Sequence, residues 1–143
     1  MALTKARHGI EPLTLTLLRV FTGVVMAAHG WLKIQGFEET VGHFTAMGMP
    51  MPKVMVSLAI AGELGGGLGL IVGFLTPLAA LGVFFTMAVA VFKVHLGNGL
   101  FAKDGGFEFP ATLMFVALFF VMRGAGPISI DALFCRKSKA AVS

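Results

Sequence analysis

Four long apolar stretches dominate the pattern of this chain, and polar residues interrupt them only singly. The stretches cover roughly residues 13–32, 54–72, 77–96 and 107–122. The first three are close to the roughly 20 residues that a helix needs to cross the hydrocarbon core of a bilayer. A soluble helix of this length would carry a polar face, whereas these stretches are apolar all round, which suits contact with lipid. The pattern predicts an all-α fold: a single domain forming an integral membrane four-helix bundle.

The segment between the first two stretches, Gly36–Pro52, has a pattern of its own. Apolar side chains recur in it at helical spacing, while Glu38 and Glu39 fall elsewhere on the helical wheel. This arrangement is typical of an amphipathic helix lying in a membrane interface. We therefore expect a short external interfacial helix before the second span. Its apolar positions are Phe37, Val41, Phe44 and Met47.

The second stretch carries a row of glycines at helical spacing. Gly62, Gly66, Gly69 and Gly73 fall on one face. Small residues on a membrane helix let a neighbouring backbone approach closely. We expect this face to contact another helix, either within the chain or in a homo-oligomer, with Glu63 beside it.

The charged residues report the orientation of the chain. Only 13% of the residues are charged and 57% are apolar, whereas a soluble domain has about 25% and 45–50%. The net charge of +4 comes without a basic stripe interleaved with aromatic residues, so we expect no nucleic acid among the partners. By the positive-inside rule, basic residues near the chain ends predict cytoplasmic N and C termini and external longer loops. These residues are Lys5, Arg7, Arg123, Arg136, Lys137 and Lys139.

Two further features bear on the compartment and on redox chemistry. The first stretch follows a basic segment, as a secretory signal would, but it contains Arg19 and no small-residue cleavage site, so we expect a retained span. The single cysteine, Cys135, allows neither an internal disulfide nor a Cys-x-x-Cys pair. A redox role would therefore need an electron carrier from a partner.

Three ionisable residues each lie well inside a different apolar stretch: Arg19 in the first, Glu63 in the second and His95 in the third. An ionisable side chain at the centre of a membrane helix costs at least about 2.5–3.5 kcal/mol, so it usually faces the bundle interior and has a partner. We expect Arg19 and Glu63 to form an ion pair. The pair would either hold two helices in register or take part in chemistry, and the sequence leaves both readings open.

A second polar group is expected near the outer ends of the first and third stretches. His29 and His95 lie at similar depths there, with Lys33, Lys93 and Glu108 at about the same level. Histidine titrates near neutrality and can act as an acid or a base. Together these groups could bind a polar head group and move protons. Alternatively, each is an interfacial residue satisfied by water or by a carbonyl group.

Two histidines on different helices could also ligate a haem iron. No second histidine pair exists in the spans and neither histidine has a haem-site context, so we expect no haem. Structural zinc usually takes four Cys or His ligands, which leads us to expect no metal site. The sequence also contains no phosphate-binding loop, nucleophile elbow or dinucleotide fingerprint.

Taken in order, short motifs along the chain resemble the DoxX family of small bacterial four-span membrane proteins. The resemblance runs from Leu17 to Leu133, and the ordered set of motifs is specific. The matching pieces are Leu17-Leu-Arg-Val20 with Gly23, His29-Gly30 with Lys33, Phe44 with Gly48-Met-Pro-Met-Pro52, Gly62-Glu-Leu-Gly-Gly66, Gly73-Phe-Leu-Thr-Pro77, His95 with Gly97, Gly105-Gly-Phe-Glu-Phe-Pro110, and Gly124-Ala-Gly-Pro127 with Ser129 and Asp131.

The resemblance implies a protein of the bacterial cytoplasmic (inner) membrane and a role in a redox system. The family is named for a subunit linked to thiosulfate oxidation and quinone reduction. It implies quinone as the cofactor or substrate, a redox partner protein and, if the chain is an enzyme, an oxidoreductase subunit acting on a quinone. We expect Glu63 and His95 to be catalytic, and Arg19, His29, Glu63, His95 and Glu108 to bind the substrate.

Two other functions stay open at this stage. The chain could be a non-catalytic membrane scaffold that anchors a partner or self-associates through its glycine face. It could also be a carrier of a small lipid or organic molecule, using the same buried polar groups.

Overall fold

A computed structural model describes residues 2–140, with side chains described from Ile10 to Cys135. This part of the chain is helical apart from short connections, which confirms the all-α prediction. The elements in chain order are α1 (Ala2–Gln35), α2 (Phe37–Ala46), α3 (Pro52–Ile60), the π-helix η1 (Ala61–Gly65), α4 (Gly66–Val72), α5 (Thr76–Val89), the π-helix η2 (Ala90–His95), the 3₁₀-helices η3 (Leu96–Asn98) and η4 (Ala102–Asp104), α6 (Glu108–Arg123) and α7 (Ile130–Ala140).

Within residues 2–140, three helices are long and apolar enough to cross a membrane. They are Ile10–Gln35 in α1, Pro52–Val72 through α3, η1 and α4, and Thr76–Asn98 through α5, η2 and η3. The fourth expected span forms α6, which has only 16 residues. At 1.5 Å per residue, α6 extends about 24 Å, less than the roughly 30 Å of a bilayer core. A fourth crossing therefore stays a prediction.

Helices α1, α4, α5 and α6 pack in this order, each against the next. All four contribute to one apolar core, in which Met26, Leu70, Val83 and Phe120 are buried. The outward face is apolar too: Phe21, for example, is largely exposed. A core and a surface that are both apolar suit a helix packed between its neighbours and lipid.

The glycine face is used inside the chain. A Cβ atom at Gly66 would lie 2.7 Å from the carbonyl oxygen of Ala79 in α5, and Gly62 and Gly69 also face α5. Gly67 faces the opposite way, where a Cβ would lie 2.7 Å from the Gly23 carbonyl oxygen of α1. The predicted close approach of a helix to this face is confirmed. Gly62, Gly66 and Gly69 thus pack against α5 within the chain, whereas Gly73 lies against Arg19 and Ser129.

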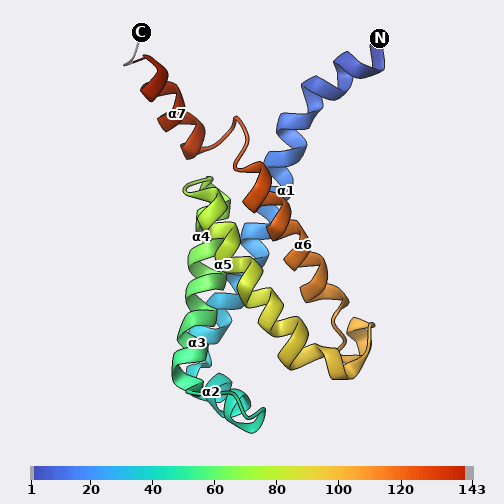
Figure 1. The fold of residues 1–143 in the computed structure, drawn as a ribbon, viewed down its shortest axis with the longest axis vertical. Coiled ribbons are helices and arrows are strands. Elements are labelled where there is room, and N and C mark those ends of the chain that lie inside the picture. Colours follow the sequence, from blue (N-terminus) through green and yellow to red (C-terminus); the bar gives the residue numbers. More distant parts are fainter. Residues whose placement is uncertain (1, 141–143) are drawn as a thin grey trace.

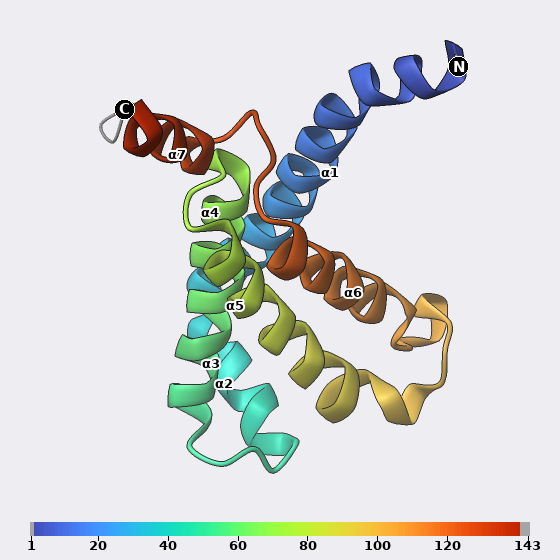
Figure 2. The ribbon, with the colours of Figure 1, turned by 45° about the horizontal axis from the view of Figure 1, so that its top comes forward.

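The beginning of α1 and the C-terminal helix α7 lie at one end of the molecule, and α2 and the connection between α5 and α6 lie at the other (Figures 1 and 2). This arrangement agrees with two ends on one side of a membrane. Which side is cytoplasmic stays a prediction, and the basic side chains of Lys5, Arg7, Arg136, Lys137 and Lys139 lie outside the described side chains.

The structure agrees with one expected helix and extends another. The segment expected to lie at the interface forms α2, although its position at a membrane surface stays a prediction. The first helix begins at Ala2, whereas the sequence predicted a start near Leu13. Proline usually ends or bends a helix, but α1 continues through Pro12.

Candidate functional site

Glu63 and His95 both come from π-helical turns inside otherwise regular helices. Glu63 lies in η1 and His95 ends η2. A π-helical turn contains one more residue per hydrogen-bonded turn than an α-helix, so it changes the direction in which the side chains after it point. Such turns are frequent at functional sites. The sequence pattern did not indicate either of them.

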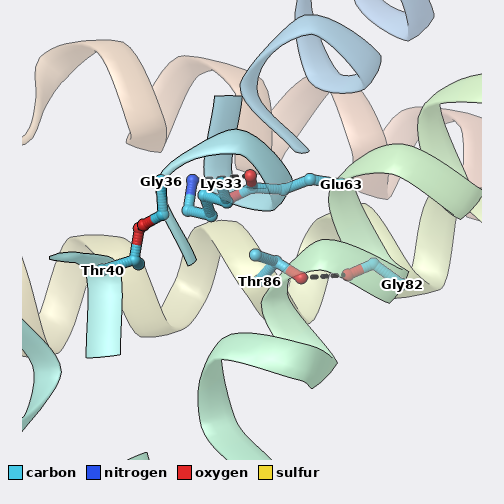
Figure 3. Close-up of polar contacts among 6 residues, drawn as sticks. All are labelled: Lys33, Gly36, Thr40, Glu63, Gly82 and Thr86. Atoms are coloured by element: carbon cyan, nitrogen blue, oxygen red, sulfur yellow. Dashed lines mark hydrogen bonds and ion pairs between the residues drawn. The ribbon is translucent and has the colours of Figure 1, made fainter. Parts of the chain in front are cut away.

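The buried carboxylate of Glu63 pairs with Lys33. Lys33 Nζ lies 2.6 Å from Glu63 Oε2, and their side chains are 24% and 4% exposed. Figure 3 shows Lys33 reaching from α1 towards Glu63. The predicted Arg19–Glu63 ion pair is therefore wrong. The physical cause is a tertiary contact: Gly30 packs directly against the backbone of Leu64, which brings the C-terminal end of α1 against η1.

Lys33 and Glu63 line a cavity of about 680 Å³, which we call the larger cavity. Its walls come from α2, α3, α5 and the residues beside them, and most of them are apolar. Its polar lining includes Lys33, Glu63 and His95. The hydroxyl of Thr86 also faces it but donates to the Gly82 carbonyl of its own helix at 2.9 Å (Figure 3). The apolar lining includes Phe44, Met47, Met55, Leu58, Phe85 and Val89.

A second cavity of about 310 Å³, the smaller cavity, lies on the other side of the same polar group. His29, Lys33, Glu63 and His95 line it, together with the connection that leads into α6. Lys33, Glu63 and His95 line both cavities, as does Ala90. The ion pair and His95 therefore form a shared wall, and we call Lys33, Glu63, Ala90 and His95 the dividing wall.

The contact of His95 fixes which of its ring nitrogens carries a proton. Nδ1 lies 2.6 Å from the carbonyl oxygen of Gly105. A carbonyl oxygen can only accept, so Nδ1 must be the donor. In the neutral ring, Nε2 is then unprotonated and can accept a proton. Asn98 donates to the same carbonyl oxygen at 3.2 Å, which helps to hold this connection over the smaller cavity.

His29 and Glu108 have different surroundings. His29 lines the smaller cavity, and its ring centroid lies 6.0 Å from that of Phe109. The Glu108 carboxylate accepts a hydrogen bond from the Ala102 backbone N–H at 2.6 Å and lines neither the larger nor the smaller cavity. The structure thus brings His29, Glu63 and His95, three of the five residues predicted to bind substrate, to the smaller cavity, and Glu108 instead holds the connection that leads into α6.

Arg19 belongs to a separate polar group near α7. It is 2% exposed, and its two terminal nitrogens donate to the carbonyl oxygens of Ala125 and Ile128, each at 2.9 Å. Its guanidinium lies against Gly73, whose φ of +68° is the left-handed conformation that glycine adopts without steric cost. Arg19 thus fastens the α6–α7 connection to α1, and it lines neither of the two cavities.

Asp131 completes this second group. Its carboxylate accepts hydrogen bonds from the backbone N–H groups of Leu75 at 2.8 Å and Thr76 at 2.9 Å. These are unpaired donors at the start of α5, so Asp131 caps that helix from a distant part of the chain. Ser129 caps α7 by accepting from Ala132 N–H at 3.1 Å.

Sequence reasoning missed the pairing of Lys33 and the capping by Asp131. For Lys33 a signal existed, because it lies four residues after His29 and therefore on the same face of α1. For Asp131 the signal was weak, since its cap is formed with residues far away in sequence. Among the described side chains, no group of three His, Cys, Asp or Glu is placed to hold a metal ion.

Comparison with known proteins gives consistent matches along the chain. The DoxX family profile matches residues 14–96. The Escherichia coli (strain K12) inner membrane protein YqjF is 32% identical over 136 residues, which cover 90% of this chain and 97% of that protein. The inner membrane protein YphA of the same organism is 28% identical over 126 residues, covering 85% of this chain and 90% of YphA.

A relative from another bacterium carries a name that refers to redox chemistry. The Bacillus subtilis (strain 168) protein named "Putative oxidoreductase CatD" is 29% identical over 123 residues, which cover 86% of this chain and 88% of that protein. No solved structure matches the chain.

Proposed function

Because the chain belongs to the DoxX family, we propose that it is an inner-membrane subunit of a redox system and binds a quinone or quinol between its helices. In this proposal α1, the helix from α3 to α4, α5 and α6 all lie in the bilayer, with α2 at its outer surface. The shortness of α6 would be accommodated by local thinning of the bilayer. The names of YphA and YqjF support the inner membrane, and the name of CatD supports redox chemistry.

The observation that carries the proposal is that the larger cavity combines mostly apolar walls with three polar side chains that also line the smaller cavity. A quinone has a long apolar tail and a small ring with two oxygens. Side chains such as Phe44, Met55 and Phe85 offer apolar contact for the tail. Lys33, Glu63 and His95 gather at one place in the lining, where a few polar groups can orient a bound ring. The polar side chains of the larger cavity therefore suit the two oxygens of a quinone ring.

The residues of the dividing wall have separate roles in this proposal. A bound quinone supplies the chemistry of a couple that exchanges two electrons and two protons. Lys33 would provide positive charge and N–H donors, the Glu63 carboxylate would take up a proton and later release it, and His95 would do the same at Nε2. Arg19 and Glu108, which the sequence placed among the substrate-binding residues, act on structure from outside the cavity.

Electrons must come from elsewhere. The sequence contains a single cysteine and no dinucleotide fingerprint, so the proposal includes a redox partner protein that carries a flavin, haem or iron–sulfur group. This partner would dock on the membrane protein and exchange electrons with the bound quinone.

A carrier of a small lipid or organic molecule is the second candidate function. The apolar walls of the larger cavity favour it, because they would suit any amphiphile. A carrier would move its ligand across or along the membrane without a redox change. Self-association through the glycine face, on which a scaffold role would rest, has less support because α5 occupies that face.

The test is mass spectrometry with a visible spectrum on gently purified protein. We expect co-purified quinone in the unmodified protein, and its loss in Glu63→Gln and in His95→Ala. Glu38→Gln, which changes an exposed carboxylate on α2, should keep the quinone and serves as the matched control. A preparation with only ordinary phospholipid would contradict the proposal. A Soret band would instead assign His29 and His95 to a haem iron.

A further inference from the structure

We infer that the smaller cavity is a water-filled proton passage that connects the dividing wall to the solution at the α2 end of the molecule. The inference rests on the proposed function, because it concerns the protons that a quinone couple exchanges at Glu63 and His95. It assigns to the smaller cavity a role distinct from that of the larger one, which would hold the ligand.

The lining of the smaller cavity favours water. Four ionisable side chains face it, His29, Lys33, Glu63 and His95. Glu63 is buried, Lys33 and His95 are half-buried, and His29 is exposed. Polar groups that are removed from bulk solvent need hydrogen-bond partners. A buried water commonly makes about three hydrogen bonds, and its share of liquid volume is about 30 Å³. A cavity of about 310 Å³ therefore has room for a chain of waters bridging the four groups.

The position of the smaller cavity gives the passage a direction. Its roof includes Ala102, Gly105 and Gly106, in the connection between α5 and α6. This connection lies towards the end of the molecule occupied by α2, away from α7 (Figure 1). Lys103 and Asp104, two charged residues in the same connection, are exposed. The passage therefore opens on the side opposite to the chain ends.

The roof is held in place by its own hydrogen bonds. Phe107 N–H donates to the Gly99 carbonyl oxygen at 3.1 Å, and Glu108 N–H donates to that of Leu100 at 3.0 Å. The Glu108 carboxylate accepts from Ala102, as described above. A fixed roof keeps the polar groups below it at constant positions, which a chain of bridging waters requires.

The groups along the passage can hand on a proton. Titratable groups near Glu63 are Lys33 and His29 from α1, His95 from η2, and His43 from α2 across the larger cavity. Reduction of one quinone consumes two electrons from the redox partner and two protons, and oxidation of the quinol releases the same number. These protons pass between His95 Nε2 or the Glu63 carboxylate and the solution, with His29 as the outer group.

Cysteine labelling tests whether the smaller cavity holds water. Cys135 is the only cysteine, so Cys135→Ser gives a background for Met87→Cys, which lines the smaller cavity alone, and Ala90→Cys in the dividing wall. Ala102→Cys reports the roof, and Phe92→Cys, on the exposed apolar face of η2, is the lipid-facing control. A charged, membrane-impermeant thiol reagent is added to sealed vesicles of each orientation.

A cysteine reacts with the reagent as its thiolate, and the thiolate forms readily only where water reaches the sulfur. We expect Met87→Cys and Ala90→Cys to react at least about tenfold faster than Phe92→Cys, and only from the side that labels Ala102→Cys. Reaction as slow as that of Phe92→Cys at both positions would overturn the inference, as would reaction from the opposite side. Because labelling needs no quinone, a protein that labels as expected but binds no quinone overturns the proposed function alone.

Infrared spectroscopy in D₂O tests proton movement directly. A ring band of His95 is identified by its disappearance in His95→Ala, and it reports the exchangeable N–H of the imidazole. We expect this band to shift on exchange with D₂O in the unmodified protein, and to shift more slowly in His29→Phe, which removes the outer group. An unchanged exchange in His29→Phe, with the fold intact by circular dichroism, would overturn the role of His29 in the passage.

Discussion

Lys33 and Glu63 form an ion pair between the C-terminal end of α1 and the π-helical turn η1, with Nζ 2.6 Å from Oε2. Glu63 is almost fully buried, whereas Lys33 keeps partial exposure. The pair thus joins two helices and, at the same time, places a charged donor and a carboxylate in the lining of both cavities. The pair therefore has a structural role and lies where a ligand would bind. Replacing the two residues separately and together measures the structural role.

Removing one partner of this pair should cost more than removing both. Breaking a buried ion pair typically costs about 3–5 kcal/mol, because the other charge is left unpaired. We expect Lys33→Met to lower the free energy of unfolding in detergent by an amount towards the lower end of this range, since Lys33 is partly exposed. Lys33→Met combined with Glu63→Gln should recover part of the loss. Lys53→Met, an exposed lysine of α3, is the control and should change little.

The helical fold could be predicted because an apolar stretch of about 20 residues indicates a helix that can span a membrane. The segments Ile10–Gln35, Pro52–Val72 and Thr76–Asn98 coincide with three expected stretches. The beginning of α1 could not be predicted, since its residues have no apolar periodicity and Pro12 resembles a boundary. The crossing by α6 also stayed open, because its 16 residues are near the shortest length at which a span can be assigned.

The polar group beside the cavities was predicted only in part: His29, Glu63 and His95 line a cavity, whereas Arg19 and Glu108 line neither of the two, and the partner of Glu63 was not predicted. Glu63 lies nine residues from either end of the expected stretch 54–72, which is about 13 Å from each end. Depth alone therefore could not choose between Arg19 and Lys33 as its partner. The π-helical turn also shifts Glu63 away from the position that a regular helical wheel predicts. The choice depends on the packing of Gly30 against Leu64, a contact between segments distant in sequence.

Adding a methyl group to the glycine face should separate packing from helix propensity. A Cβ at Gly66 would lie 2.7 Å from the Ala79 carbonyl oxygen, whereas nothing lies within 4 Å of one at Gly65. We expect Gly66→Ala to lower the free energy of unfolding by about 1–3 kcal/mol through overpacking. Gly65→Ala should be neutral or stabilising by up to about 1 kcal/mol, because alanine restricts the unfolded chain. Equal destabilisation by both changes would show that α5 does not pack on this face as described.

Replacement of Arg19 should release the α6–α7 connection without affecting the dividing wall. Arg19→Met removes two hydrogen bonds from a charged donor, each typically worth about 1.5–3 kcal/mol. Hydrogen exchange should then become faster at the Asp131 and Ala132 amides, which bond to Gly73 and Ser129. Arg19→Lys should restore only part of the protection, because a lysine lacks the forked guanidinium.

The matched control for Arg19 is Arg123, whose exposed side chain lies 3.3 Å from Glu11. Exposed ion pairs contribute at most about 1 kcal/mol, so Arg123→Met should leave the exchange of these amides nearly unchanged. If quinone content fell in Arg19→Met while the α6–α7 connection stayed protected, Arg19 would have a direct role in binding, as the sequence first suggested.

Two substitutions of His95 should separate its two ring nitrogens. The Asn side chain places its amide nitrogen near the position of Nδ1, so His95→Asn can still donate to the Gly105 carbonyl oxygen, but it offers nothing at the position of Nε2. The longer Gln side chain places a polar group near Nε2 and lacks the donor at Nδ1. We expect His95→Asn to keep slow hydrogen exchange at Gly106 and Phe107 N–H, which bond within the connection, yet to lose bound quinone. His95→Gln should show faster exchange at these amides. Retention of quinone by His95→Asn would mean that Nε2 takes no part in binding, and that His95 acts only by holding the connection above the smaller cavity.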